Sequence, residues 1–551
     1  MKRREFINTA LTGGFLMLTG KRFAAQEARL ADARIEILLD EPIGRIAPEI
    51  YGHFAEHLGG VVYDGIWVGE NSKVPNIGGI RQALVEAMKR IRASVIRWPG
   101  GCFADSYNWR DGVGPRKDRP RRPNFWIDAT EWPKGAPDGP WKYETNHFGT
   151  DEFLRFCQLS GAQPYLAANL RSLTARDFYE WVDYCNSPAA ATTLAEMRGA
   201  AGQREPWNVR YWGVGNESWG CGGNFTPEEY AVEYRRFSEW VPRYGLNLAF
   251  IGSGPNAGDL SWSRRFFGRL AEKGGFGRMW GWALHHYSWN VTGGRTNNWF
   301  EGKGDAVKYP DDEWYELLSE ANRMENLITD HWSVMGEFDR QHRVKLVVDE
   351  WGAWYKPGSE AHNTHLLGQQ ATIRDAVLAG LTLDIFHRHA DKVAMANVAQ
   401  LINCLQSLFL AHEDKFILTP TYHVFDMYAA HQGGQSLRTN VSSSPLKYMR
   451  NGSPAAMRGL NGSASLSDRR LVLTVTNPDP KASRETEIAV HGANVKDVGV
   501  TTLTAKDIHE RNSFDNPRAI EPQASQAAAR GGALIYNFAP ASVTRLQITL
   551  A

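Results

Sequence analysis

Short apolar runs alternate with amphipathic segments from about Glu49 onward, and this alternation limits the possible folds more than any other feature. Strands that alternate with helices are typical of a parallel sheet covered by helices. The apolar positions also predict helices over residues 79–92, 150–160 and 226–244. The predicted strands span residues 49–54, 94–98, 163–168, 209–215, 248–252, 279–285, 345–349 and 395–401.

Eight strand–helix units over about 380 residues predict an α/β fold, a (β/α)8 TIM barrel with long loops. A doubly wound open sheet is the alternative, but no predicted strand is followed by a GxGxxG motif or a P-loop. After about His431, Ser, Asn, Gly and Pro become frequent between short β-prone runs, which predicts a C-terminal all-β sandwich of jelly-roll type. We therefore expect a barrel over 48–431 and a sandwich over 432–551, with residues 27–47 adding strand to the sandwich.

Residues 1–26 resemble a twin-arginine export signal. Arg3 and Arg4 precede a mildly apolar stretch of 15 residues, 6–20, which is too short to span a bilayer comfortably. This segment predicts a periplasmic or secreted protein that has no membrane attachment once the signal is removed. An accidentally basic N-terminus is the alternative.

The charge balance and the cysteines exclude several classes of protein. The chain has 62 Lys+Arg and 61 Asp+Glu, and a formal net charge of +1 argues against a nucleic-acid partner. Adjacent His285 and His286 on a strand would point to opposite faces, and no HExxH motif is present, so no metal is predicted. No CxxC pair occurs, which argues against a zinc cluster or a disulfide framework and predicts free, buried thiols. The five cysteines are Cys102, Cys157, Cys185, Cys221 and Cys404.

Two predicted strands, the fourth and the seventh, end in carboxylates. Asn216-Glu217 follows one strand, and Asp349-Glu350 follows the other. Active sites of such barrels lie at the C-terminal strand ends, and these two strands face each other across the mouth. Two carboxylates that face each other over a pocket can cleave a glycosidic bond, one as proton donor and the other as nucleophile or base. The alternative is a pair of structural ion pairs, and Asp349 is expected to point away from the pocket.

Gly215-Asn216-Glu217 and Asp349-Glu350-Trp351 resemble the two signatures of the retaining clan of (β/α)8 glycosidases. Other stretches narrow the resemblance to the α-L-arabinofuranosidases of glycoside hydrolase family 51, and it extends from about residue 34 to the C-terminus. These stretches are IYGHFAEHL at 50–58, RWPGG at 97–101, YNWRDGVGP at 107–115, LHHY at 284–287 and LTPTYHVF at 418–425.

The resemblance implies a role for each matching residue. Glu217 would be the general acid/base and Glu350 the nucleophile, with Arg97 keeping the nucleophile ionised. Cys102 stands where many members carry an Asn that binds the sugar, and a thiol is a weaker hydrogen-bond partner than an amide. The substrate-binding residues implied are Glu56, Cys102, Asn216, His285, Tyr287, Trp354 and Gln400.

The function implied by the resemblance is that of a retaining exo-α-L-arabinofuranosidase. Its substrate would be arabinan, arabinoxylan or arabino-oligosaccharides, no cofactor would be needed, and the chain would form a homo-oligomer, with a hexamer as one form. An endo-acting β-glucanase or xylan-type hydrolase on the same scaffold and a non-catalytic sugar-binding protein are the alternatives. The long predicted loop 117–148, rich in Pro, Trp and Arg, favours a walled pocket over an open cleft.

Overall fold

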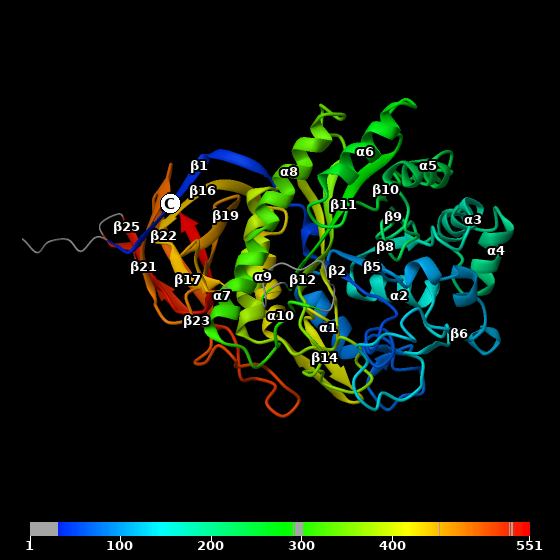
Figure 1. Ribbon diagram of the computed structural model, residues 1–551, viewed down its shortest axis with the longest axis horizontal. Helices are drawn as coiled ribbons and strands as arrows, with labels where there is room; N and C mark the ends of the chain where they lie inside the picture. Colours follow the sequence, from blue (N-terminus) through cyan, green and yellow to red (C-terminus); the bar gives the residue numbers. More distant parts are fainter. Residues whose placement is uncertain (1–30, 290, 292–300, 451, 528, 531–532) are drawn as a thin grey trace, which may run out of the picture. The chain divides into compact units, whose positions relative to one another are not determined.

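The computed structural model describes residues 31–289, 291, 301–450, 452–527, 529–530 and 533–551. Eight strands form a closed barrel in the order β10-β11-β12-β13-β2-β5-β8-β9, and every neighbouring pair is parallel (Figure 1). The predicted (β/α)8 barrel is therefore confirmed. The barrel strands are β2 (Gly52–Phe54), β5 (Val95–Trp98), β8 (Gln163–Ala168), β9 (Tyr211–Val214), β10 (Ala249–Gly252), β11 (Met279–Ser288), β12 (Lys345–Ala353) and β13 (Val393–Ala399).

The observed strands differ from the predicted ranges by up to four residues at an end, and three of the strands differ most. The first is shorter, because Pro48–Tyr51 forms a 3₁₀ helix ahead of β2, with Pro48 at a position where a missing N–H costs nothing. The strands β11 and β12 run three or four residues beyond the predicted ends. Their extensions carry Tyr287 and Glu350 into the barrel mouth.

Helices follow most barrel strands, as the amphipathic segments predicted. The helix α5 begins with Thr226 as N-cap and Pro227 in the first turn, but it ends at Ser238, because Glu239 is extended and Pro242 follows. The helices are α1 (Gln82–Arg90), α2 (Thr150–Ser160), α3 (Ala175–Asn186), α4 (Thr193–Ala200), α5 (Pro227–Ser238), α6 (Leu260–Ala271), α7 (Asp311–Asn322), α8 (Met324–Gly336), α9 (Ile373–Arg388) and α10 (Pro420–Tyr428).

The C-terminal part of the chain forms an all-β domain, as predicted, built on a ten-stranded sheet (Figure 1). The strand β1, from the start of the described chain, lies between β16 and β21 and buries Ile35 and Ile37 on one face. In sheet order the strands are β23 (Gln523–Ala527), β22 (Val495–Leu503), β26 (Ser542–Leu550), β20 (Arg470–Asn477), β19 (Asn461–Ser467), β16 (Gln435–Ser443), β1 (Ala33–Arg45), β21 (Arg484–His491), β25 (Ala533–Phe538) and β24 (Ala529–Arg530).

Short two-stranded sheets lie outside the barrel and the main sheet. The hairpin formed by β14 and β15 follows β13 and lies at the rim of the barrel mouth. These strands are β3 (Asn76–Ile77), β4 (Ile80–Arg81), β6 (Arg122–Pro123), β7 (Tyr143–Glu144), β14 (Phe409–His412), β15 (Lys415–Leu418), β17 (Leu446–Arg450) and β18 (Ser453–Met457).

The helix α9 joins the barrel to the all-β domain. It is buried over nearly its whole length and contacts β12 on one side and β16, β19, β20 and β26 on the other. Asp384, at its centre, accepts hydrogen bonds of 2.7 Å from the hydroxyls of Ser463 and Thr474 in the all-β domain. These hydrogen bonds offset part of the free-energy cost of burying the Asp384 carboxyl group.

The predicted export segment, residues 1–26, lies outside the described residues. Among the residues that the structure describes, no helix combines the length and apolar character needed to cross a membrane.

Replacing Asp384 by Ala should destabilise the whole chain. Two buried hydroxyls would lose their acceptor, at a cost of about 2–4 kcal/mol in total. We expect a lower thermal midpoint and a lower urea midpoint. Asp311→Ala is the matched control, because it removes an exposed ion pair with Lys481 between the same two domains and should change stability by less than about 1 kcal/mol. Equal stability of the Asp384 and Asp311 variants would contradict the prediction.

Candidate active site

A cavity of about 810 Å³ opens at the C-terminal ends of the barrel strands. The predicted acid, nucleophile and substrate-binding residues all line it, and Arg97 lies beneath it in contact with Glu350. Aromatic side chains from the loops form much of the remaining wall. The predicted residues in the wall are Glu56, Cys102, Asn216, Glu217, His285, Tyr287, Glu350, Trp354 and Gln400.

Glu350 is held by one cation and one hydroxyl. Arg97 donates from Nη1 to Oε1 at 2.7 Å, and the Tyr287 hydroxyl donates to Oε2 at 2.7 Å. Burial raises the pKa of Glu350, but the charges of His285 and Arg97 and these hydrogen bonds outweigh burial and hold the pKa below its ordinary value. Glu350 is therefore an ionised carboxylate at neutral pH.

A β-bulge explains why two consecutive acidic residues both face Arg97. Leu284 of β11 pairs with Val348 and His285 pairs with Glu350, so Asp349 is the extra residue in β12. Asp349 accepts a hydrogen bond of 2.8 Å from the Tyr165 hydroxyl, and its Oδ2 lies 3.7 Å from Arg97 Nε. It is absent from the cavity wall and anchors Arg97 from below.

Glu217 lies opposite Glu350, in the loop that follows β9. Its Oε1 lies 3.0 Å from Nδ1 of His285, which in turn lies 3.6 Å from Glu350 Oε2. The nearest side-chain atoms of these three residues all lie within 4.8 Å of one another. Burial lowers the pKa of His285, but the negative charges of Glu350 and Glu217 outweigh burial and raise it.

The two carboxylates differ in solvent access. The Glu217 side chain is 19% exposed and the Glu350 side chain 7%, so Glu217 can exchange protons with water more readily. Together with His285 they could surround a cation, but the buried guanidinium of Arg97 beside Glu350 already supplies a positive charge there. The arrangement suits a proton donor facing an ionised nucleophile.

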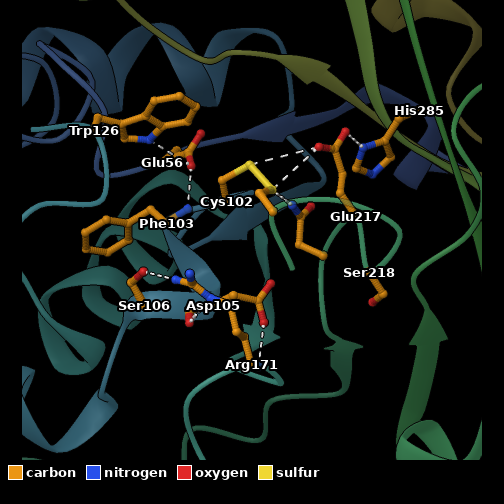
Figure 2. The surroundings of a disulfide bond; sticks show 12 residues. Glu56, Cys102, Phe103, Asp105, Ser106, Trp126, Arg171, Glu217, Ser218 and His285 are labelled. Carbon is orange, nitrogen blue, oxygen red and sulfur yellow. Dashed lines mark hydrogen bonds and ion pairs between the residues drawn. A yellow bond between two sulfur atoms is a disulfide. The ribbon is translucent and has the colours of Figure 1, made fainter. Parts of the chain in front are cut away.

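Glu56, at the end of β2, forms the side of the cavity. Its oxygens accept hydrogen bonds from the Phe103 N–H at 2.9 Å and the Trp126 indole at 3.2 Å (Figure 2). They also accept one from the Gln400 amide at 3.1 Å. Burial raises the pKa of Glu56 to about 7. Near neutral pH this carboxyl can therefore either donate to or accept from a sugar hydroxyl.

Close approach of the backbone explains the Gly-Gly pair after Trp98-Pro99. A Cβ on Gly100 would lie 2.5 Å from Glu56 Cγ, and a Cβ on Gly101 would lie 3.0 Å from Glu350 Oε1. Gly100 also has φ +157°. A side chain at either position would displace a carboxylate of the site.

The cysteine prediction was wrong for one pair. Cys102, in the loop after β5, and Cys221, in the loop after β9, form a disulfide across 119 residues (Figure 2). The sequence gives no sign of this pairing, because it depends on two loops that meet only at the barrel mouth. Cys157, Cys185 and Cys404 are free and buried, as predicted.

The disulfide changes what Cys102 can contribute to the site. The Cys102 sulfur lies 4.0 Å from Glu217 Oε2, and the Cys221 sulfur lies 3.7 Å from the same oxygen. A disulfide sulfur carries no hydrogen, so Cys102 cannot act as the thiol donor considered from the sequence. It offers the cavity a rigid, weakly polar surface against the outer oxygen of Glu217.

The remaining predicted residues complete the wall. Asn216 accepts a hydrogen bond of 2.5 Å from Arg97 Nη2, and Trp354 packs edge-on against Tyr287 with ring centroids 5.0 Å apart. Sequence reasoning missed Trp126 and Trp219, which also line the cavity. Trp126 lies in the long loop 117–148, whose length and Trp content were the available signal.

Comparisons with known proteins agree with this architecture. Residues 87–291 match the family model of the α-L-arabinofuranosidase 1 domain, and residues 349–542 match that of the α-L-arabinofuranosidase C-terminal domain. An intracellular exo-α-L-arabinofuranosidase of Bacteroides ovatus is 35% identical over 523 residues, which cover 95% of each chain. A solved GH51 arabinofuranosidase of Xanthomonas axonopodis pv. citri is 34% identical with a TM-score of 0.85, over 94% of this chain and all of that one. An α-L-arabinofuranosidase of Thermotoga maritima, solved with arabinose, is 27% identical with a TM-score of 0.79 over the same shares.

The barrel, the facing carboxylates and these relatives define a glycoside hydrolase. Within that class, the chain belongs to the α-L-arabinofuranosidases of glycoside hydrolase family 51, as its motifs indicated.

The predicted location outside the cytoplasm was wrong. The Bacteroides ovatus relative, which matches almost the whole chain, is named as an intracellular enzyme. The prediction rested on the two arginines and short apolar stretch of residues 1–26, a composition that a basic N-terminus can reach by chance.

The disulfide predicts a defined thiol count. Protein purified without reductant and unfolded in guanidinium should show three thiols by a colorimetric assay and five after reduction. Loss of the cross-link in a Cys102→Ala/Cys221→Ala variant should cost about 4–5 kcal/mol in the chain-entropy account of a loop this long. Cys157→Ala serves as the control for thiol counting. Five thiols before reduction would contradict the pairing.

Proposed function

We propose that this chain is a retaining exo-α-L-arabinofuranosidase that releases terminal, non-reducing α-L-arabinofuranosyl residues by double displacement. The observation that supports this most directly is the spacing of Glu217 and Glu350, whose nearest oxygens lie within 4.8 Å of each other across the cavity. Retaining enzymes hold their two carboxyl groups about 5–5.5 Å apart, whereas inverting enzymes leave room for a water between them.

In the first step Glu350 attacks the anomeric carbon, and Glu217 protonates the departing glycosidic oxygen. The low pKa of Glu350 keeps it ionised for attack, and Arg97 and Tyr287 fix its two oxygens. In the second step Glu217 takes a proton from water, which attacks the anomeric carbon and releases arabinose from Glu350. His285, within reach of both carboxylates, stabilises whichever one is ionised.

The remaining wall residues bind the furanose ring. Asn216 contacts the 2-hydroxyl, and Glu56 with Gln400 contacts the other hydroxyls from the opposite side. Trp354 and Tyr287 give one apolar wall, and the Cys102–Cys221 disulfide packs against the sugar beside Glu217. Arabinan, arabinoxylan and arabino-oligosaccharides are the proposed substrates.

The comparisons favour this function over both alternatives weighed from the sequence, an endo-acting β-glucanase or xylan-type hydrolase and a non-catalytic sugar-binding protein. We further propose that the chain forms a homo-oligomer, which light scattering can test. We also propose that the barrel domain spans residues 48–431 and the all-β domain residues 432–551. This boundary is supported by β16, the first strand of the all-β domain after the barrel, which begins at Gln435.

Alanine variants should separate the roles of the two carboxylates. Glu350→Ala should lower turnover of 4-nitrophenyl α-L-arabinofuranoside by about 10⁴-fold or more, because no nucleophile remains. Glu217→Ala should lower turnover of arabino-oligosaccharides by about 10²–10⁴-fold, but much less for an aryl leaving group that needs no proton.

Azide provides a chemical check on the same variants. It should restore turnover of Glu217→Ala and give an arabinofuranosyl azide of retained configuration. Exposed Glu205→Ala is the control and should behave as wild type. Equal losses for Glu217→Ala on good and poor leaving groups would argue against acid catalysis.

Arg97 should set the acidic limb of the pH profile. Arg97→Lys keeps the charge but replaces the guanidinium that donates to Glu350 Oε1 with a shorter ammonium side chain, so the pKa of Glu350 should rise and the acidic limb of kcat/KM should move to higher pH. Tyr287→Phe, which removes a neutral donor, should move that limb less. An unchanged acidic limb in the Arg97 variant would contradict this assignment.

A further inference from the structure

Three histidines and one aspartate meet at the rim of the barrel mouth, outside the proposed active site. His362 and His365 lie in the loop after β12, His412 ends β14, and Asp64 lies in the loop after β2. One side-chain nitrogen of each histidine lies within 4.8 Å of the others. Asp64 Oδ2 lies 2.8 Å from His412 Nδ1 and 3.4 Å from His365 Nε2.

The cluster is built into the fold and is not a chance surface meeting. The His365 ring is fully buried, and a Cβ on Gly60 would lie 2.3 Å from it, so the backbone is shaped around this ring. Among the described residues, Nδ1 of His365 has no hydrogen-bond partner. The other oxygen of Asp64 accepts from the Glu413 N–H at 2.8 Å, which fixes the carboxylate with Oδ2 toward the histidines.

The side chains of the cluster are of the kinds that bind divalent metal ions in proteins. Imidazole nitrogens and a carboxylate oxygen are metal ligands. Arg81 lies beside the other oxygen of Asp64, with Nη2 3.6 Å from Oδ1, so Oδ2 is the oxygen that faces the histidines.

We propose that Asp64, His362, His365 and His412 form a structural zinc site. Three nitrogens and one oxygen are a donor set that tetrahedral Zn²⁺ accepts, with bonds of about 2.0–2.2 Å. His362 Nδ1 lies 2.9 Å from the Thr364 hydroxyl and accepts from the Thr364 N–H at 3.3 Å, which leaves Nε2 as its ligand atom. The His362 and His412 rings stack with centroids 3.6 Å apart.

The ion would join three segments of the rim. Leu367, two residues beyond His365, lines the cavity, and its carbonyl accepts from the Leu405 N–H at 2.9 Å. Zinc would therefore fasten the loop after β12, the loop after β2 and the β14–β15 hairpin around one side of the substrate pocket. The site takes no part in the proposed hydrolysis.

Metal content tests the proposal directly. The full chain, freed of any histidine tag, is stripped with a chelator, incubated with ZnSO₄, desalted and measured by elemental analysis. We expect about one zinc per chain and a higher thermal midpoint with zinc than without it. X-ray absorption should show nitrogen and oxygen ligands and no sulfur.

Variants identify the ligands. Loss of a residue that only hydrogen-bonds to a metal ligand lowers metal affinity by about 10–100-fold. Loss of a ligand should cost more, so His362→Gln and His412→Gln should each weaken zinc binding by about 100-fold or more. His491→Gln, at an exposed histidine of the all-β domain, is the control and should bind as wild type. Absence of zinc after incubation, or stoichiometric zinc in the His362 and His412 variants, would overturn the proposal. Because metal is measured without turnover, its failure would leave the proposed hydrolysis untouched.

Discussion

The buried guanidinium of Arg97 is the interaction on which the rest of the site depends. It is fully buried, and it contacts Glu350, Asp349 and Asn216 from one position in β5. Three charged groups can be buried together only when opposite charges pair with one another. The bulge in β12 makes this pairing possible, because it brings both Asp349 and Glu350 to the side of Arg97. One cation thus fixes Glu350 and orients the Asn216 amide that precedes Glu217.

The barrel mouth places groups of different chemistry at different depths. Asp349 lies below the cavity and Glu350 at its floor, while Glu217 is more open to water. The loops then build the walls, with Trp126 reaching Glu56 and the disulfide contacting Glu217. Strands β5 and β12 hold Arg97 and Glu350, whereas loops carry Glu217 and shape the rest of the cavity.

Sequence patterns predicted the barrel well because strands buried on both faces read as continuous apolar runs. The polar strands β16 and β19, rich in Ser, Thr and Asn, give no such signal. The facing glutamates could be predicted from their strand-end positions. The Cys102–Cys221 pair could not be predicted, because it joins two loops whose cysteines are 119 residues apart in the sequence. The histidine cluster could not be predicted either, because His412 is far in the sequence from His362 and His365.

The helix α9 is buried on every side, and this limits how the all-β domain could be removed or exchanged. Residues of the all-β domain, among them Leu503 and Val543, belong to the same hydrophobic core as the barrel. Removing the C-terminal strands would expose the apolar side chains and the Asp384 carboxylate of α9 to solvent. The barrel is therefore not expected to fold on its own without the all-β domain. Any exchange of the accessory domain between relatives would have to carry α9 along or rebuild its outward face.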